Sequence, residues 1–349
     1  MTAVYRRAQL LIVSIAGLMV LLALVASISL HKPPVDPDGF LGPSWLRLPL
    51  LVALALFVDI VPRTLWVSRG RPSRMQAVAV DRWGSHWTHD RRVLVLTGLL
   101  GFYLTYVSYR NLKSYLPFIV GPQYGYDFEL HRVDHALFLG HDPGVVLHDL
   151  LGSGISAEVL SFVYLWFLPL VPIALTIWLI WSRNLARGYW FATSQCLAWS
   201  LGTLSYYALP TLGPGIQYAW IYKTVDDTNA AKLMGSLADG RVFLLNGSLT
   251  GSIQSVAGFA SLHAAITLLF ALMIQYTVRS RALRIFFWVN FGLTLVATIY
   301  FGWHYLVDDI AGIAIALVSF YVGGLVSNQD FSRHREEAAE ERPREVTTV

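Results

Sequence analysis

Apolar runs close to membrane-spanning length recur along this chain of 349 residues. About 20 residues of helix cross the hydrocarbon core of a bilayer, and a backbone inside lipid has to satisfy its hydrogen bonds internally. The composition agrees, because 55% of the residues are hydrophobic and only 14% are charged, against about 25% charged residues in soluble domains. The sequence therefore predicts an all-α fold, a polytopic membrane helix bundle.

Hydropathy predicts eight transmembrane helices. The first follows Arg6 and Arg7, and its apolar stretch is longer than the roughly 7–15 residues of a signal-peptide core, so we expect it to be retained. The single cysteine, Cys196, falls inside an apolar run and has no partner for an internal disulfide. The eight expected spans are 8–30, 46–67, 93–109, 157–181, 188–209, 258–278, 285–303 and 306–326.

The distribution of lysine and arginine predicts the orientation of the bundle. With the N-terminus in the cytoplasm, the cytoplasmic segments hold 18 of the 26 basic residues, and each carries at least two arginines. Cytoplasmic loops are enriched in Lys and Arg, so both termini are expected to be cytoplasmic. The net charge of +4 then follows from these loops, and we expect no nucleic-acid partner.

The segments between the spans suggest three parts. Residues 1–92 comprise two transmembrane helices and a cytoplasmic loop, residues 93–327 form a six-helix core, and residues 328–349 read as a disordered cytoplasmic tail. Within the core, residues 110–156 are too charged to span and predict short interfacial helices on the outer side. Residues 210–257 begin PTLGPG and predict an ordered but irregular cap.

Two histidines lie at the edges of apolar runs, and both are expected on the outer side. His263 begins the sixth span, and His304 precedes the eighth. Asp308 follows His304 by four residues, a spacing that puts two side chains on one helix face and lets a carboxylate hold the second imidazole nitrogen. Asp309, five residues away, is turned off that face. Each histidine alone is equally compatible with a simple interfacial position at a helix end.

These segments resemble a known family. SLHAA at 261–265 and YFGWHYLVDDIAG at 300–312 resemble the second and third signature motifs of the type 2 phosphatidic acid phosphatase superfamily, and most closely its inositol phosphorylceramide synthase-like branch. YYALPTLGPG at 206–215 and RVDHALFLGHDP at 132–143 are weaker matches to earlier segments of that branch. The resemblance covers roughly residues 100–325.

The resemblance implies a role for each matching residue. His304 would be the nucleophile that attacks phosphorus, Asp308 would orient it, and His263 would protonate the leaving oxygen and then serve as the base. Ser261 and nearby N–H groups at the helix start would bind phosphate oxygens, which the helix dipole favours. The implied two-histidine chemistry needs neither a metal nor another cofactor, and no HExxH motif is present.

The sequence departs from the phosphatase branch in its phosphate-binding residues. That branch carries a Lys…Arg-Pro first motif and an arginine six residues before the third-motif histidine, where Thr298 stands here. Arg110 and Lys113 are the candidates to neutralise phosphate charge, although ordinary snorkelling explains them equally well. Asp134 and His135 could line a pocket or belong to a solvated interfacial helix.

The resulting hypothesis is an integral membrane enzyme, expected in the cell membrane with its active site on the extracytoplasmic side. It would move a phosphoryl group or phospho-headgroup, such as phosphoinositol, from a lipid donor to a hydroxyl acceptor. The alternatives are a lipid phosphate phosphatase, with water as the acceptor, and a non-enzymatic membrane transporter or scaffold.

Overall fold

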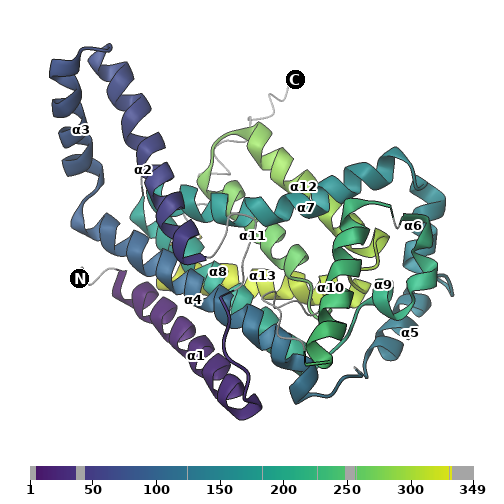
Figure 1. Ribbon diagram of the computed structural model, residues 1–349. Helices are drawn as coiled ribbons and strands as arrows, with labels where there is room; N and C mark the ends of the chain where they lie inside the picture. The colour runs from purple at the N-terminus through teal and green to yellow at the C-terminus, as the bar shows by residue number, and fades with distance from the viewer. Residues whose placement is uncertain are drawn as a thin grey trace, which may run out of the picture.

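The computed structural model describes residues 5–36, 44–123, 125–182, 184–225, 227–247, 256, 258–329 and 331, and these residues form helices and connecting turns without a strand (Figure 1). The α-helices are α1 (Arg6–Leu30), α2 (Ser44–Ser68), α3 (Pro72–His86), α4 (His89–Ile119), α5 (Asp127–Leu137), α6 (Pro143–Leu151), α7 (Ile155–Thr176), α8 (Leu185–Ala208), α9 (Pro214–Gln217), α10 (Asn229–Leu245), α11 (Leu262–Thr277), α12 (Arg281–Tyr300) and α13 (Leu306–Val326). A π-helical turn, Ile177–Trp181, extends α7, and 3₁₀ turns occupy Ala219–Ile221 and Lys223–Val225.

Five helices of the described chain are long and apolar enough to cross a membrane: α1, α4, α7 with its π-helical extension, α12 and α13. Helix α11 is apolar but has only 16 residues. Helices α2 and α8 form close to where spans 46–67 and 188–209 were predicted, but they are not among the five. The total of eight spans and the cytoplasmic termini therefore stay predictions.

Helix α8 lies in the middle of the bundle, in contact with α1, α4, α11 and α13. Its buried residues include the polar side chains of Thr193, Ser194 and Gln195. A helix enclosed by other helices can carry such groups because they find partners in protein rather than facing lipid. The Ser194 hydroxyl, for example, donates to the Ser319 carbonyl of α13 at 3.0 Å.

The sequence placed several boundaries wrongly. Helix α11 begins at Leu262 rather than at residue 258, because the Ser261 side chain accepts the Ala264 N–H and caps the helix there. The predicted irregular cap, 210–257, contains the 17-residue helix α10. Thr228 caps that helix, and good helix formers such as alanine and leucine outweigh its two glycines. The short helices predicted within 110–156 are present as α5 and α6, but residues 110–119, expected outside the spans, continue α4.

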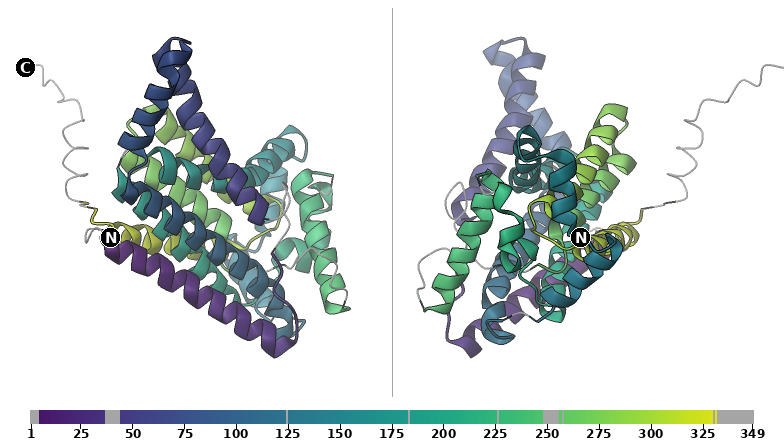
Figure 2. Two further views of the ribbon diagram at one scale, coloured as in Figure 1. Left: turned by 60° about the vertical axis from the view of Figure 1, so that its left-hand side comes forward. Right: turned by 90° about the vertical axis from the view of Figure 1, so that its right-hand side faces the viewer.

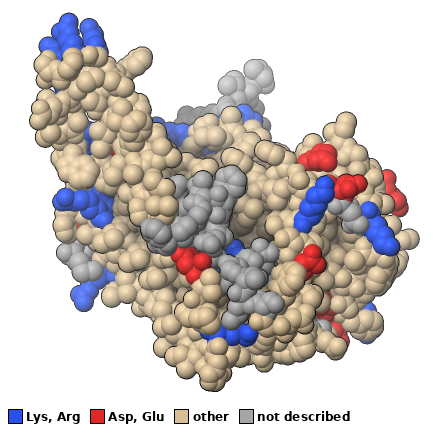
Figure 3. Space-filling model, in the orientation of Figure 1, with Lys and Arg blue, Asp and Glu red and all other residues tan. Residues whose placement is uncertain are grey.

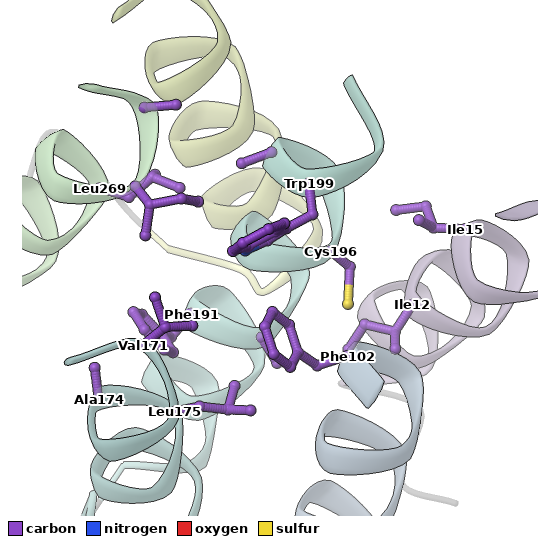
Figure 4. Packing of buried hydrophobic residues seen from close by; sticks show 14 of the residues in the cluster. Ile12, Ile15, Phe102, Val171, Ala174, Leu175, Phe191, Cys196, Trp199 and Leu269 are labelled. Carbon is purple, nitrogen blue, oxygen red and sulfur yellow. The ribbon is translucent and has the colours of Figure 1, made fainter. Parts of the chain in front are cut away.

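The hydrophobic core joins helices from both ends of the chain. Figure 4 shows Ile12 of α1, Phe102 of α4, Leu175 of α7, Trp199 of α8 and Leu269 of α11 directed toward a common centre. Trp199 packs edge-on against Phe102, with ring centroids 6.1 Å apart. Helix α1 thus shares the core of the predicted 93–327 unit. The three-part division of the chain stays a prediction.

Helices α2 and α3 form a hairpin that projects from the bundle (Figures 1 and 2). Its tip lies at the opposite end of the molecule from α5, α6 and α9. Basic side chains gather at this tip (Figure 3), where Arg69, Arg71 and Arg74 are exposed. The predicted tail beyond Phe331 lies outside the described residues.

Candidate active site

The two histidine segments meet where α11 and α13 begin. His263 is the second residue of α11, and His304 lies two residues before α13. The Ser261 N–H donates to the Asp308 carbonyl oxygen at 3.0 Å, and the imidazole centroids of His263 and His304 are 6.4 Å apart. Gly312 permits this approach, since a Cβ there would overlap the Ser261 carbonyl oxygen.

His304 is held by Asp308. Nδ1 of His304 lies 3.3 Å from Oδ2 of Asp308, and the same oxygen accepts the Tyr305 N–H at 3.0 Å. Both side chains are buried. The contact expected from the four-residue spacing is present. It is not a contact between two residues on one helix face, however, because His304 precedes the helix. Asp308 stands in the first turn of α13 and reaches back past its start, as a capping carboxylate does.

His263 lies in an aromatic niche on α7. Its ring stacks on Tyr164, with centroids 4.2 Å apart, and lies at the same distance from Phe167. Trp303 stacks on Tyr164 at 4.9 Å. The Nε2 atom of His263 is buried and has no hydrogen-bond partner within the described structure. Since buried polar atoms are normally paired, this nitrogen suits a group brought by a ligand.

Asp309 has a different partner from Asp308. Its Oδ2 accepts the Thr298 hydroxyl at 2.8 Å, and both residues are buried. Thr298 stands where the phosphatase branch would have an arginine. Asp309 is thus hydrogen-bonded to a neutral hydroxyl at the position where the phosphatase branch would have a positive charge.

Helix α5 braces the segment around His304 through two buried aspartates. Asp127 accepts the N–H groups of Leu212 and Gly213 at 2.9–3.1 Å and the Tyr305 hydroxyl at 3.0 Å. Asp134 accepts the Leu306 N–H at 3.1 Å. Burial raises the pKa of both carboxyl groups, that of Asp134 to about 7.

The loop after α8 connects the two histidine segments. Thr211 accepts the Gly258 N–H with its carbonyl oxygen at 2.8 Å and the Phe259 N–H with its hydroxyl at 2.9 Å. At the start of α9, which follows this loop, the Gly215 N–H donates to the Gly302 carbonyl oxygen at 2.6 Å. These contacts bring the weakly matching 206–215 segment to the site.

The three predicted phosphate-binding residues lie in different settings. Ser261 is fully buried, and its hydroxyl caps α11. On α4, the Arg110 guanidinium donates to the Tyr106 hydroxyl at 3.2 Å. The Lys113 ammonium lies over the rings of Tyr109 and Tyr206 and forms no ion pair among the described residues. Lys113 is also close enough to His263 to act on it electrostatically.

Potential metal ligands occur away from the histidine pair. In the described part of the chain, donor atoms of His131, His135 and Asp142 lie within 4.8 Å of one another. Among the described residues, no hydrogen bond, ion pair or ring contact links any of these three to His263 or His304.

Sequence reasoning missed Asp127, Tyr164 and Thr211. Asp127 and Thr211 bind backbone N–H groups that are distant along the chain, and backbone partners leave no residue signature. Tyr164 reads as one aromatic among many in an apolar span. The charged 110–156 segment holds five acidic residues, and nothing in the sequence separates Asp127 from the other four.

The fold and the site together define a helical membrane protein with a buried histidine–aspartate pair facing a second histidine. The model of the PAP2 superfamily matches residues 128–322, more than half of the chain, and the chain belongs to this superfamily. Membership indicates a phosphatase-type enzyme, an integral membrane protein that acts on lipid-like substrates. Searches of curated proteins and of solved structures found no match.

Proposed function

We propose that the protein is a membrane lipid phosphotransferase that acts through a phosphohistidine. The observation that carries the proposal is the His304–Asp308 pair, 3.3 Å apart, facing a second imidazole whose Nε2 has no protein partner in the described structure. A phosphorus atom accepts a nucleophile on one side and releases an oxygen on the other. Two imidazoles with centroids 6.4 Å apart are close enough for both to reach one phosphate group.

The reaction proceeds in two displacements. Nε2 of His304 attacks phosphorus while the bond to the leaving oxygen breaks, and His263 gives that oxygen a proton. The acceptor hydroxyl then loses its proton to His263 and attacks the phosphohistidine, which frees His304. Covalent catalysis of this kind divides one difficult step into two easier ones. Asp308 stabilises the positive imidazole in each step, and no step requires a metal.

Charge stabilisation falls to Lys113, Arg110 and the start of α11. A lysine within a membrane-spanning helix is costly unless it has an anionic partner, and Lys113 lies over two tyrosine rings without an ion pair within the described structure. A phosphate ester would supply that partner. The positive end of the α11 dipole, next to His263, favours the same anion, and Ser261 holds this helix end in place.

The donor is a lipid phosphate or phosphodiester and the acceptor a hydroxyl compound, as in the inositol phosphorylceramide synthase-like branch, where the headgroup is phosphoinositol. The site opens on the extracytoplasmic side of the cell membrane. This placement is supported by the position of the arginine-rich α2–α3 tip at the opposite end of the bundle (Figure 3). With water as the acceptor, the same phosphohistidine would make the protein a phosphatase.

The test is to trap the intermediate and identify the acceptor. Purified protein is incubated with a panel of labelled lipid phosphates and phosphodiesters, and acid-labile, base-stable phosphate on His304 is sought by mass spectrometry. Headgroup exchange with added polyol supports transfer, whereas release of inorganic phosphate alone makes the protein a phosphatase. His304→Ala should abolish both products while the protein remains folded. Intact function in that variant would favour a transporter or scaffold instead.

Ser261→Ala separates a helix-capping role from a chemical one. Loss of an N-cap costs about 0.5–2 kcal/mol of stability, so this variant should retain partial activity. Complete loss in a folded protein would make the Ser261 hydroxyl part of the chemistry.

A further inference from the structure

A compact cluster of three potential ligands joins α5 to the start of α6. His131 and His135 are one helical turn apart on α5, with ring centroids 4.4 Å apart. Asp142 immediately precedes α6. Its Oδ1 lies 2.9 Å from Nε2 of His135 and 3.5 Å from Nε2 of His131. Both imidazoles therefore present the same ring nitrogen to one carboxylate oxygen.

Asp142 is the N-cap residue of α6, but its side chain does not cap the helix. At the N-cap of a helix, an aspartate side chain normally accepts an N–H group of the first turn. The Asp142 side chain makes no such bond to α6. It turns instead to the two imidazoles on α5, although capping would stabilise the helix that it precedes. This orientation indicates a role for the carboxylate shared with the histidines.

We propose that His131, His135 and Asp142 bind a divalent transition metal of the zinc class. Zinc takes imidazole nitrogen and carboxylate oxygen at about 2.0–2.2 Å in tetrahedral geometry, which separates neighbouring donor atoms by about 3.3–3.5 Å. Of the observed separations, 3.5 Å lies at the upper limit of this range and 2.9 Å lies below it. The side chains are 19%, 35% and 24% exposed, so water can complete the coordination.

The metal would hold the α5–α6 connection in place. Helix α5 also carries Asp127 and Asp134, whose carboxylates accept the Tyr305 hydroxyl and the Leu306 N–H in the segment that follows His304. Fixing α6 against α5 therefore restrains the helix that braces the active site. His131, which also stacks on Tyr218 at 4.1 Å, extends this restraint to the loop after α9. The site is structural and stands whichever acceptor the enzyme uses.

The test measures zinc binding to the intact protein, purified without a histidine tag and freed of metal with a chelator. Zinc chloride is titrated against a chromophoric chelator, and cobalt chloride is used to record the visible absorption of a tetrahedral site. The wild-type chain should take up about one ion per molecule. His135→Gln and Asp142→Asn should each weaken binding more than about 100-fold, since even loss of an outer-sphere partner costs about 10–100-fold. His141→Gln alters an exposed neighbour outside the cluster and should bind as wild type does.

Thermal unfolding with and without zinc gives a second measurement that does not depend on enzyme activity. Zinc should raise the unfolding temperature of the wild-type and His141→Gln proteins but not that of Asp142→Asn, which keeps an oxygen for the His135 hydrogen bond and should fold. Absence of stoichiometric binding to the wild type would overturn the proposal. Zinc binding by Asp142→Asn and His135→Gln that equals wild-type binding would also overturn it. The three residues would then form a hydrogen-bonded cluster without a metal.

Discussion

Replacing Asp308 by asparagine tests whether this carboxylate activates His304. Asp308 is fully buried, and its Oδ2 lies 3.3 Å from Nδ1 of His304 and 3.0 Å from the Tyr305 nitrogen. Asparagine keeps the shape and can still accept the Tyr305 N–H, but it lacks the negative charge. A hydrogen bond to a charged group contributes about 1.5–3 kcal/mol. At about 1.36 kcal/mol per tenfold change, the rate of phosphotransfer to His304 should fall by about 12- to 160-fold.

The assay is single-turnover transfer of labelled phosphate from the best lipid of the panel, in mixed micelles at saturating substrate. Because Asp308 does not contact the substrate in the proposed mechanism, the loss should appear in kcat rather than KM. Asp309→Asn is the matched control. Its carboxylate accepts from Thr298 and not from His304, so the loss of activity should stay below about tenfold.

Two results would refute this reasoning. If Asp308→Asn retains nearly full kcat, the carboxylate does not stabilise the charged imidazole. If Asp309→Asn loses more activity than Asp308→Asn while both proteins stay folded, the neighbouring acid has the orienting role that we assign to Asp308.

Three further changes have defined outcomes. Lys113→Met keeps the apolar stem over the tyrosine rings but removes the charge, so KM for a lipid phosphate should rise by about tenfold or more. Burial lowers the pKa of His148 below its ordinary value of 6.5, and its Nε2 donates to the Tyr300 carbonyl. The unfolded chain therefore takes up a proton that the folded chain excludes, and stability falls as the pH drops below 6.5. Because His148→Gln lacks this titrating group, the variant should lose less stability than wild type between pH 7.5 and pH 5.5. Gly312→Ala places a methyl group against Ser261, so it should cost about 1–3 kcal/mol in chemical unfolding and lower kcat by separating the histidines.

Two of these changes have a control elsewhere in the chain. Lys32 also lies over an aromatic ring, at 4.2 Å. It has no contact with His263 or His304 within the described structure, so Lys32→Met should leave KM unchanged. Gly292, on α12, has open space at its Cβ position, so Gly292→Ala should be tolerated. An unchanged KM in the Lys113 variant, an unaltered pH slope in the His148 variant or full kcat in Gly312→Ala would each contradict the corresponding assignment.

Local features of the sequence were reliable where a contact spans one turn of the chain. The predicted contact between the Asp308 carboxylate and His304 is present, but Asp308 makes it as a capping group in the first turn of α13 and not along a helix face, since the helix starts after His304. Spans such as 306–326 were found at their bounds, because long apolar runs in lipid have no alternative to a helix. The prediction of an irregular cap at 210–257 was wrong, because the glycines and the loop-like composition of this segment obscured the helix-forming residues of α10.

The sequence by itself determined the helical membrane class, the histidine–aspartate pair and the superfamily, because each depends on composition or on neighbours along the chain. Only the tertiary structure decided that the rings of His263 and His304 have centroids 6.4 Å apart, that Tyr164 and Phe167 pack against His263, and that Asp127 accepts the Tyr305 hydroxyl. These contacts join residues more than 40 positions apart. They depend on side-chain packing between helices and on backbone N–H partners, and neither has a signature in the order of residues.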